Sequence, residues 1–250
     1  RHNLLVLEDA CQADGGSYGG KRLGSIGHAG AFSYNHFKIM TCGEGGALVT
    51  NDRTIYERAL IFHDGGSSFR DHADQIKTPF FAGWNFRINE ILSAILRVQL
   101  TRLDGMLEAM LAEKRTMIQE LDGAGPFTFN PIHDIEGDCG TTLALQLESK
   151  EKMRTFLAKL DEEGVSASSP IDSGRHVYTN WEPVLGKQGA HNTAFNAYEL
   201  APDAAHYSAD MCPVTLDALA RSVFLYTNPE RSREDLQAMI EKVKRAAAKI

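Results

Sequence analysis

The sequence predicts an α/β protein in which a larger domain with a mostly parallel sheet precedes a smaller C-terminal α/β domain. Short apolar segments alternate with helical ones along all 250 residues, which is typical of this class. A long helical pattern over 89–121 separates two such groups. The composition, 43% hydrophobic and 24% charged, is that of a globular chain large enough for two domains. We place the large domain at 1–105, a linking helix at 106–125 and the small domain at 126–250.

The first domain is predicted from three short strands and a helix. Leu4–Leu7 is an apolar run that ends in Glu8-Asp9, as in a buried parallel strand that carries a carboxylate at its C-terminal end. Residues 15–30 are rich in glycine and are expected to form a loop. The elements expected next are strands at Ala29–Tyr34 and Ala47–Thr50, a helix at Asp52–Phe62 and an irregular segment over 63–83.

The second domain is predicted from the pattern that follows the long helix. Gly123 and Pro126 end that helix, which is either one long helix or two in line. Ser232 and Asp235 have the spacing of a capping box at the start of a last amphipathic helix. The expected elements are strands at Thr141–Leu147, Val165–Ser168 and Val223–Tyr226, and helices at Lys150–Glu163 and Ser232–Ile250.

The chain begins at Arg1, without Met, and enters an apolar segment within three residues. A domain usually opens with polar residues that tolerate change. We therefore expect that an N-terminal part of the protein is missing from this sequence.

Charge and cysteine usage exclude several classes of protein. The net charge of −7 argues against general nucleic-acid binding, which needs a basic surface for phosphates. No apolar run reaches the roughly 18 residues of a membrane span. The cysteines have no zinc-site spacing and are expected as free thiols of the cytoplasm, so no metal, membrane or nucleic acid is expected as a partner. They are Cys11, Cys42, Cys139 and Cys212.

Four polar side chains are expected at one edge of the large sheet. Asp9 ends a strand, with Gln12 just after it; Ser33 ends a later strand, and Lys38 follows five residues on. Ligands of α/β sheets bind outside the carboxyl ends of strands. Pyridoxal phosphate (PLP) needs an amine for its aldehyde, a carboxylate for its pyridinium nitrogen and small donors for its phosphate. Lys38, Asp9 and Ser33 supply these groups.

Other interpretations of the same residues are available. Lys38 alone is compatible with an exposed loop lysine, and Asp9 with a helix cap. Gly15–Gly19 matches the G-x-S-x-G pattern of hydrolases, but Ser17 lies in a glycine-rich loop and not between a strand and a helix. A non-catalytic or regulatory protein on the same scaffold is a further alternative. The presence of both Lys38 and Asp9 disfavours it.

Four motifs in order resemble the DegT/DnrJ/EryC1 family of PLP-dependent sugar aminotransferases. They are Leu7-Glu8-Asp9-Ala10-Cys11-Gln12-Ala13, Gly30-Ala31-Phe32-Ser33, Lys38 followed by Gly43-Glu44-Gly45-Gly46-Ala47, and Trp84-Asn85-Phe86-Arg87-Ile88-Asn89-Glu90-Ile91. The resemblance covers essentially the whole chain. It implies a fold-type-I PLP-dependent transferase that works as a homodimer with shared active sites.

The resemblance also assigns roles to the cofactor-binding residues. Lys38 is implied to form the Schiff base with PLP and to act as the proton-shuttling base. Asp9 is implied to pair with the pyridine nitrogen and Gln12 to lie near the ring hydroxyl. Ser33 is implied to bind the phosphate, and Asn85 to reach the phosphate of the neighbouring subunit's cofactor.

Substrate contacts are assigned by the same resemblance to Arg87, His176 and Tyr178. Dehydratases of the family carry His in place of the lysine, so Lys38 favours transamination. The implied reaction moves an amino group from glutamate or glutamine to a keto or aldo sugar, usually nucleotide-linked. Such sugars belong to the biosynthesis of lipopolysaccharide, other cell-surface polysaccharides or antibiotics. An inosose or an eight-carbon acid sugar is the alternative acceptor.

Overall fold

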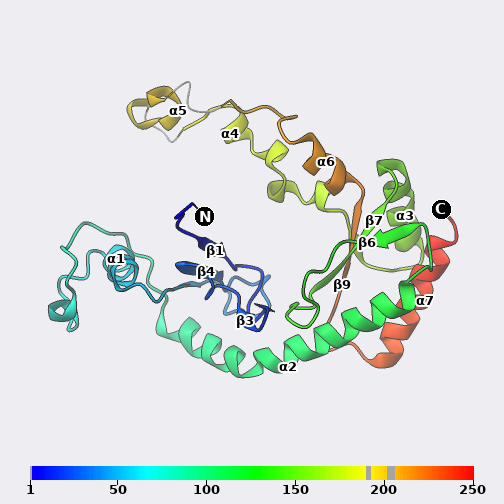
Figure 1. The fold of residues 1–250 in the computed structure, drawn as a ribbon, viewed down its shortest axis with the longest axis horizontal. Helices are drawn as coiled ribbons and strands as arrows, with labels where there is room; N and C mark the ends of the chain where they lie inside the picture. The colour runs from blue at the N-terminus through cyan, green and yellow to red at the C-terminus, as the bar shows by residue number, and fades with distance from the viewer. Residues whose placement is uncertain (1, 190–192, 202–205) are drawn as a thin grey trace. The chain divides into compact units, whose positions relative to one another are not determined.

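A computed structural model describes residues 2–189, 193–201 and 206–250, and the chain divides into two compact units (Figure 1). Unit 1 comprises Arg1–Ala112 and Ile132–Thr141, and unit 2 comprises Glu113–Pro131 and Thr142–Ile250. The long helix α2 (Glu90–Leu121) contributes to both units. Residues 106–125, predicted as a linking helix, are mostly the C-terminal half of α2.

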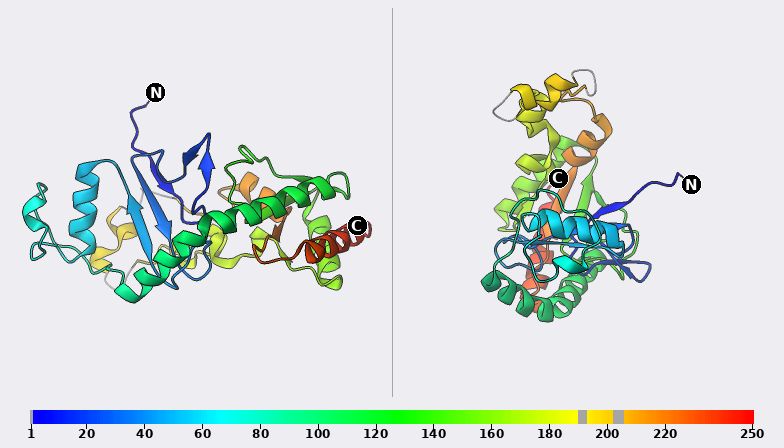
Figure 2. Two further views of the ribbon diagram at one scale, coloured as in Figure 1. Left: turned by 90° about the horizontal axis from the view of Figure 1, so that it is seen from below. Right: turned by 90° about the vertical axis from the view of Figure 1, so that its left-hand side faces the viewer.

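Unit 1 is built on a mixed three-stranded sheet of order β1-β4-β5 (Figure 2). β1 (Leu7–Asp9) and β4 (Ala29–Ser33) are parallel, with Asp9 opposite Ala31. β5 (Gly46–Val49) pairs antiparallel with β4. The expected α/β class is confirmed, and β4 and β5 lie within one residue of the predicted strands.

The first strand differs from the prediction. Leu4–Leu7 was expected to be buried, but the strand begins at Leu7, and the side chains of Leu4 and Leu5 are 71% and 81% exposed. Among the described residues only β4 pairs with β1, so its other edge is not covered. The apolar pattern correctly indicates a strand, but burial also requires a neighbouring element.

The glycine-rich segment 15–30 contains a small antiparallel hairpin, β2 (Ser17–Tyr18) with β3 (Lys21–Arg22), where the sequence predicted only a loop. The turn after the hairpin is held by the carboxylate of Glu8 in β1. Its oxygens accept the backbone N–H groups of Gly24, Ile26 and Gly27 at 2.7, 2.6 and 2.5 Å. These donors, Gly27 foremost, lower the pKa of Glu8.

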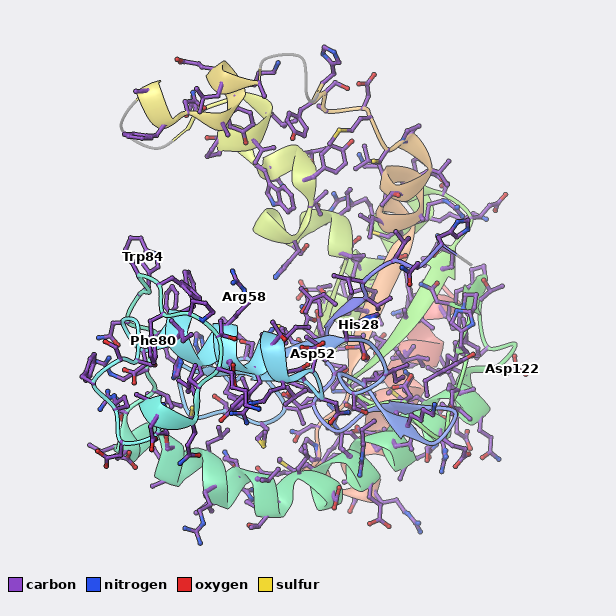
Figure 3. The ribbon with its side chains drawn as sticks, turned by 60° about the vertical axis from the view of Figure 1, so that its left-hand side comes forward. His28, Asp52, Arg58, Phe80, Trp84 and Asp122 are labelled. Atoms are coloured by element: carbon purple, nitrogen blue, oxygen red, sulfur yellow. The ribbon has the colours of Figure 1, made fainter. Side chains whose placement is uncertain are left out.

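Helix α1 (Arg53–His63) begins where the sequence predicted it. Asp52, labelled in Figure 3, is its N-cap, and its Oδ1 accepts the N–H groups of Thr54 and Ile55 at 2.8 and 3.0 Å. Asp52 thereby satisfies two of the donors that a helix start leaves unpaired. The predicted helix is therefore confirmed, with its first residue moved by one.

Buried Glu57 attaches α1 to the irregular segment that follows it. Its carboxylate accepts from Thr78, through both the hydroxyl and the N–H at 2.8 Å, from the N–H of Lys77, and from Arg53 at 2.7 Å. These bonds, with the Thr78 hydroxyl first, lower the pKa of Glu57 to about 2. The only helical turn described over 63–83 is η1 (Ala73–Gln75).

The expected long helix is a single helix, α2, of 32 residues. Its side chain Leu103 joins a small core with Tyr34, Met40 and Cys42. Earlier positions of the same pattern, such as Ile91 and Val98, are 75% and 61% exposed. The helical period is therefore confirmed, but Leu92 and Leu96, not Ile91 and Val98, pack against the small core.

Unit 2 contains a four-stranded antiparallel sheet of order β6-β7-β9-β8. Alternate side chains of β7 are buried against the helices, as expected for a sheet covered on one face. The strands are β6 (Phe127–Phe129), β7 (Thr142–Leu147), β8 (Ala167–Ser168) and β9 (Ser222–Tyr226). The helices of this unit are α3 (Lys150–Glu162), α4 (Glu182–Leu185), α5 (Ala197–Leu200), α6 (Pro213–Ala220) and α7 (Arg233–Ala247). Ser232 caps α7 as predicted, with its Oγ accepting the N–H of Asp235 at 3.0 Å.

The core of unit 2 is centred on Phe156 of α3, whose side chain is fully buried and stacks on Phe127 with ring centroids 5.6 Å apart. We expect Phe156→Ala to lower the free energy of unfolding by about 3–5 kcal/mol, because it removes the ring and leaves a cavity. Denaturant unfolding measures this loss. The matched variant Phe195→Ala changes a phenylalanine that is 79% exposed, so its effect should stay within about 0.5 kcal/mol. Equal effects of the two variants would contradict this description of the core.

No helix in the described part of the chain combines the length and the apolar character that crossing a bilayer requires.

Candidate active site

The parallel pairing of β1 and β4 brings two of the predicted residues to one edge of the sheet. Asp9 is the last residue of β1 and lies opposite Ala31. Ser33 is the last residue of β4, two positions further along. Because the carboxyl ends of parallel strands emerge at the same edge, both side chains are positioned where ligands of α/β sheets bind.

Lys38 lies in the loop that connects β4 to β5. The loop is closed by the N–H of Cys42, which donates to the carbonyl of Tyr34 at 3.1 Å, and by a bridge between Asn35 and Gly43. Gly43 has φ +95°, a left-handed conformation that favours glycine. Lys38 itself is half-buried, and its N–H donates to the carbonyl of Asn35 at 3.0 Å. The loop therefore holds the lysine in a defined turn just beyond the strand ends.

The charges of Asp9 and Lys38 interact. Asp9 Oδ1 accepts the N–H of Cys11 at 3.2 Å, and the Cys11 side chain also hydrogen-bonds to this carboxylate. Cys11 is the main cause of a lowered pKa of Asp9, and the positive charge of Lys38 lowers it further. The carboxyl is consequently ionised at neutral pH and lies within electrostatic range of the amine.

Gln12 and Ser33 are close to this pair in the sequence. Gln12 is exposed, three residues after Asp9, while Ser33 is half-buried opposite Gly46 of β5. The site thus combines an amine, an ionised carboxylate, an amide and a hydroxyl. The individual cofactor contacts of Gln12 and Ser33 stay predictions.

Arg87 belongs to an ion-pair cluster around Asp64 at the end of α1. Its Nη1 donates to Asp64 Oδ1 at 2.6 Å, and Arg70 holds the same carboxylate through two bonds of 2.6 and 2.8 Å. Asp64 is buried, and its pKa is strongly lowered, first by Arg70 and then by Arg87. Asn85 pairs with Asp64 through the backbone, and its Oδ1 accepts the N–H of Arg87 at 3.3 Å. The guanidinium of Arg87 is therefore engaged within unit 1.

His176 and Tyr178 belong to unit 2, in two consecutive 3₁₀ turns, η3 (Gly174–His176) and η4 (Tyr178–Asn180). The Tyr178 hydroxyl donates to the carbonyl of Ala209 at 2.9 Å and accepts the N–H of Cys212 at 3.3 Å. His176 is exposed. Their assignment to substrate stays a prediction.

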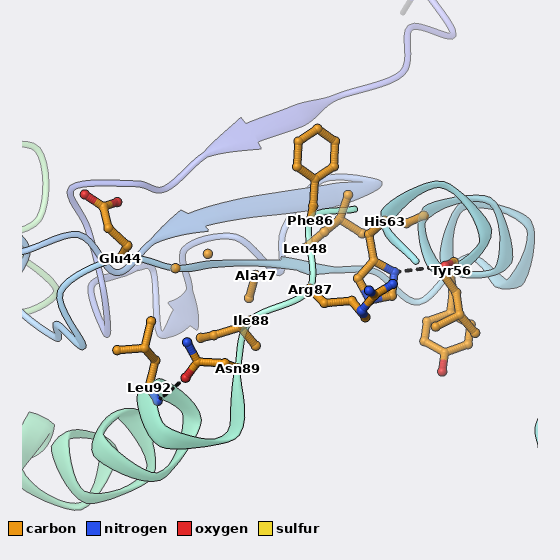
Figure 4. Close-up of a pocket in the computed structure, with 14 residues that line it drawn as sticks. Glu44, Ala47, Leu48, Tyr56, His63, Phe86, Arg87, Ile88, Asn89 and Leu92 are labelled. Carbon is orange, nitrogen blue, oxygen red and sulfur yellow. Dashed lines mark hydrogen bonds between the residues drawn. The ribbon is translucent and has the colours of Figure 1, made fainter. Parts of the chain in front are cut away.

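A cavity of about 890 Å³ lies in unit 1 between β5, α1 and the start of α2 (Figure 4). Its lining includes Glu44, His63 and Arg87, but not Asp9 or Lys38. Among the described residues, no cluster of three or more His, Cys, Asp or Glu side chains has the arrangement of a metal site.

The chain matches a known protein family over almost its whole length. The family model described as the DegT/DnrJ/EryC1/StrS aminotransferase family matches residues 1–244. Aminotransferases of that family depend on PLP. The match spans all four motifs and both units.

Two curated proteins and one solved structure are similar to this chain. The chain is 39% identical over 183 residues to the 3-amino-5-hydroxybenzoate synthase of Amycolatopsis mediterranei. The matched segment covers 71% of this chain and 46% of that protein. It is 40% identical over 111 residues to the GDP-perosamine synthase of Caulobacter vibrioides, which covers 44% of this chain and 28% of that protein. The fold is similar to that of the aminotransferase from Psychrobacter cryohalolentis, with TM-score 0.74 and 23% identity over all of this chain and 63% of the other. The chain thus matches about half or less of the length of these curated relatives.

Proposed function

We propose that this chain, which belongs to the DegT/DnrJ/EryC1/StrS aminotransferase family, forms the lysine-bearing part of a PLP-dependent aminotransferase. The observation that carries the proposal is the pairing of Lys38 with Asp9. Asp9 ends β1, Lys38 lies in the loop that follows the neighbouring parallel strand β4, and the charge of Lys38 lowers the pKa of Asp9.

The donor set fits PLP. Lys38 has the amine that would hold the cofactor's aldehyde carbon, Asp9 the carboxylate for the pyridine nitrogen, and Ser33 a hydroxyl for the phosphate. When bound, the cofactor would supply an electron sink for the carbanion that forms as a substrate loses its α-proton. Asp9, kept ionised by Cys11, would hold a proton on the ring nitrogen. Lys38 would carry protons to and from the substrate carbon as an acid–base group.

A keto sugar is the proposed acceptor, and glutamate or glutamine the proposed donor. The names of two relatives support a ring carbonyl as the reacting group, since one makes GDP-perosamine and the other 3-amino-5-hydroxybenzoate. Nucleotide-linked ketosugars, inososes and ring ketones are therefore the classes to screen, and an eight-carbon acid sugar is the remaining alternative. These products suit lipopolysaccharide or antibiotic biosynthesis.

We also propose that the enzyme is a cytoplasmic homodimer. The four cysteines are free thiols, which suits a reducing compartment. In the dimer, Asn85 would reach the cofactor phosphate of the neighbouring subunit, and Arg87, His176 and Tyr178 would contact substrate. The guanidinium of Arg87 is paired with Asp64, so its contact with substrate would either add to this ion pair or replace it.

Borohydride trapping tests the proposal. The protein expressed from its complete gene is mixed with PLP, reduced and digested, and mass spectrometry locates the modified peptide. We expect a pyridoxyl adduct on Lys38 and none on Lys21, an exposed lysine of the same unit. A folded protein without an adduct on Lys38 would overturn the proposal and favour a non-catalytic protein on this scaffold.

A further inference from the structure

Thr41 is a half-buried side chain of the loop between β4 and β5, and the proposed chemistry does not use it. Its hydroxyl donates to the carbonyl of Tyr34 at 3.2 Å and accepts the N–H of Gly43 at 3.0 Å. A threonine hydroxyl can donate one hydrogen bond and accept others at the same time. Thr41 therefore connects the end of the loop that carries Lys38 to its beginning.

The two ends of this loop are held together by a few hydrogen bonds. Between β4 and β5 the described backbone of residues 34–45 forms turns and an isolated bridge, not a helix or strand. The N–H of Tyr34 donates to the carbonyl of Gly45 at 2.9 Å, and the N–H of Cys42 donates to the carbonyl of Tyr34 at 3.1 Å. The Thr41 hydroxyl shares this last acceptor. Its loss would weaken the closure of the loop without removing it.

Lys38 lies in the turn that this closure supports. The Asn35 side chain accepts the N–H of Phe37 at 3.1 Å, and the Asn35 carbonyl accepts the N–H of Lys38 at 3.0 Å. Both bonds join residues on the same side of the loop. Among the described residues, Thr41 is the first after Lys38 that bonds back to the beginning of the loop. The path of the chain after Lys38 is therefore fixed at Thr41.

The reactivity of an amine towards a bound aldehyde depends on how well the amine is held in place. A group that is fixed near its reaction partner reacts as if it were highly concentrated, and this advantage falls when the segment that carries it moves. One intramolecular hydrogen bond changes such a local equilibrium by about 2–10-fold. The hydroxyl of Thr41 is thus expected to have a measurable effect at Lys38.

We propose that Thr41 is a positioning residue whose hydroxyl keeps the β4–β5 loop closed, so that the amine of Lys38 is presented beyond the strand ends beside Asp9. This inference rests on the proposed function of Lys38. Thr41 takes no part in the chemistry and acts only through the backbone of the loop.

Thr50 provides a matched control, because it makes the same pair of hydrogen bonds just after β5. Its hydroxyl donates to the carbonyl of His28 at 2.6 Å and accepts the N–H of Asp52 at 3.0 Å. Like Thr41, it is half-buried and binds the N–H two residues further along the chain. Thr50 lies outside the loop, so the loss of its hydroxyl should affect stability and not Lys38.

The test measures the initial rate at which borohydride fixes PLP to Lys38 in the complete protein. Thr41→Val keeps the branched shape and removes the hydroxyl, and we expect this rate to fall by about 3–10-fold. Thr41→Ser keeps the hydroxyl and should restore most of the wild-type rate. Thr50→Val should lower the denaturant midpoint about as much as Thr41→Val does and leave the rate unchanged.

Hydrogen exchange in the cofactor-free protein tests the loop without relying on PLP. Thr41→Val should speed the exchange of amides in residues 34–43 by about 3–10-fold, because the loop opens more often, whereas Thr50→Val should not change their exchange. If Thr41→Val folds poorly, Thr41→Ala removes the same hydroxyl with a smaller side chain and is expected to give the same results.

Two outcomes would overturn the role of Thr41. One is an unchanged rate of PLP fixation in a folded Thr41→Val or Thr41→Ala protein. The other is an equal slowing in Thr50→Val. Absence of an adduct on Lys38 in the wild-type protein would instead remove the proposed function, and this inference with it, whatever hydrogen exchange shows for the loop.

Discussion

Lys38→Ala should abolish amino transfer while leaving the protein folded. The loss of acid–base catalysis alone is worth about 10²–10⁴-fold in kcat, and the loss of the covalent link to the cofactor adds to it. The fold should persist because Lys38 lies in a loop whose closing bonds, from Cys42 to Tyr34 and between Asn35 and Gly43, use backbone atoms. Steady-state kinetics with glutamate or glutamine and a ketosugar, alongside circular dichroism, measure both properties.

The control for this prediction is Lys21→Ala. Lys21 is an exposed lysine of the β2–β3 hairpin, and its replacement should leave kcat unchanged. Turnover that survives in a folded Lys38→Ala protein would refute the role of Lys38.

Asp9→Asn should produce the second largest loss. Hydrogen bonds from Cys11 keep the pKa of Asp9 low, so the native side chain is anionic across the neutral range. An amide of the same shape has no charge with which to hold a proton on the ring nitrogen. By comparison with the removal of other single charge-stabilising groups, kcat should fall by about 10²–10³-fold. Trapping of PLP at Lys38 should persist, because the amine is unchanged.

Asp104→Asn serves as the control for Asp9→Asn. Asp104 is an aspartate of α2 in the same unit; its side chain is 88% exposed and has a long 3.5 Å ion pair with Arg22. Its replacement should leave kcat unchanged, because surface ion pairs contribute little. If Asp9→Asn left kcat unchanged as well, the assignment of Asp9 to the pyridine nitrogen would fail.

The prediction that Asp9, Ser33 and Lys38 gather at one edge of the sheet has a physical basis. Each residue follows a short apolar strand, and parallel pairing brings strand ends together without requiring knowledge of distant contacts. The helices α1, α2, α3 and α7 are also predicted, because their periodicity and their caps, such as Asp52 and Ser232, are local, whereas the short helices α4, α5 and α6 are not. Short strands with few residues, such as β6, carry too little pattern to be recognised.

Burial and pairing are the features that the sequence does not predict. Leu4 and Leu5 have the composition of a core strand, yet their exposure depends on which element lies next to them. Asp64 follows helix α1, and two arginines from separate segments bind its buried carboxylate, a pairing that no local sequence pattern indicates.

The adjacent acids Glu8 and Asp9 of β1 lie on opposite faces of the sheet and have different roles. Successive side chains of a strand point to opposite sides, so Glu8 holds the turn at Gly24–Gly27 while Asp9 is presented beside Lys38. A deletion or insertion of one residue within β1 would exchange the two positions. Glu8 would then lie beside Lys38, and the turn at Gly24–Gly27 would lose the carboxylate that accepts its N–H groups. Natural variation in length should therefore be absent from β1 and be found instead in the β2–β3 hairpin, whose glycine turn has open space around it.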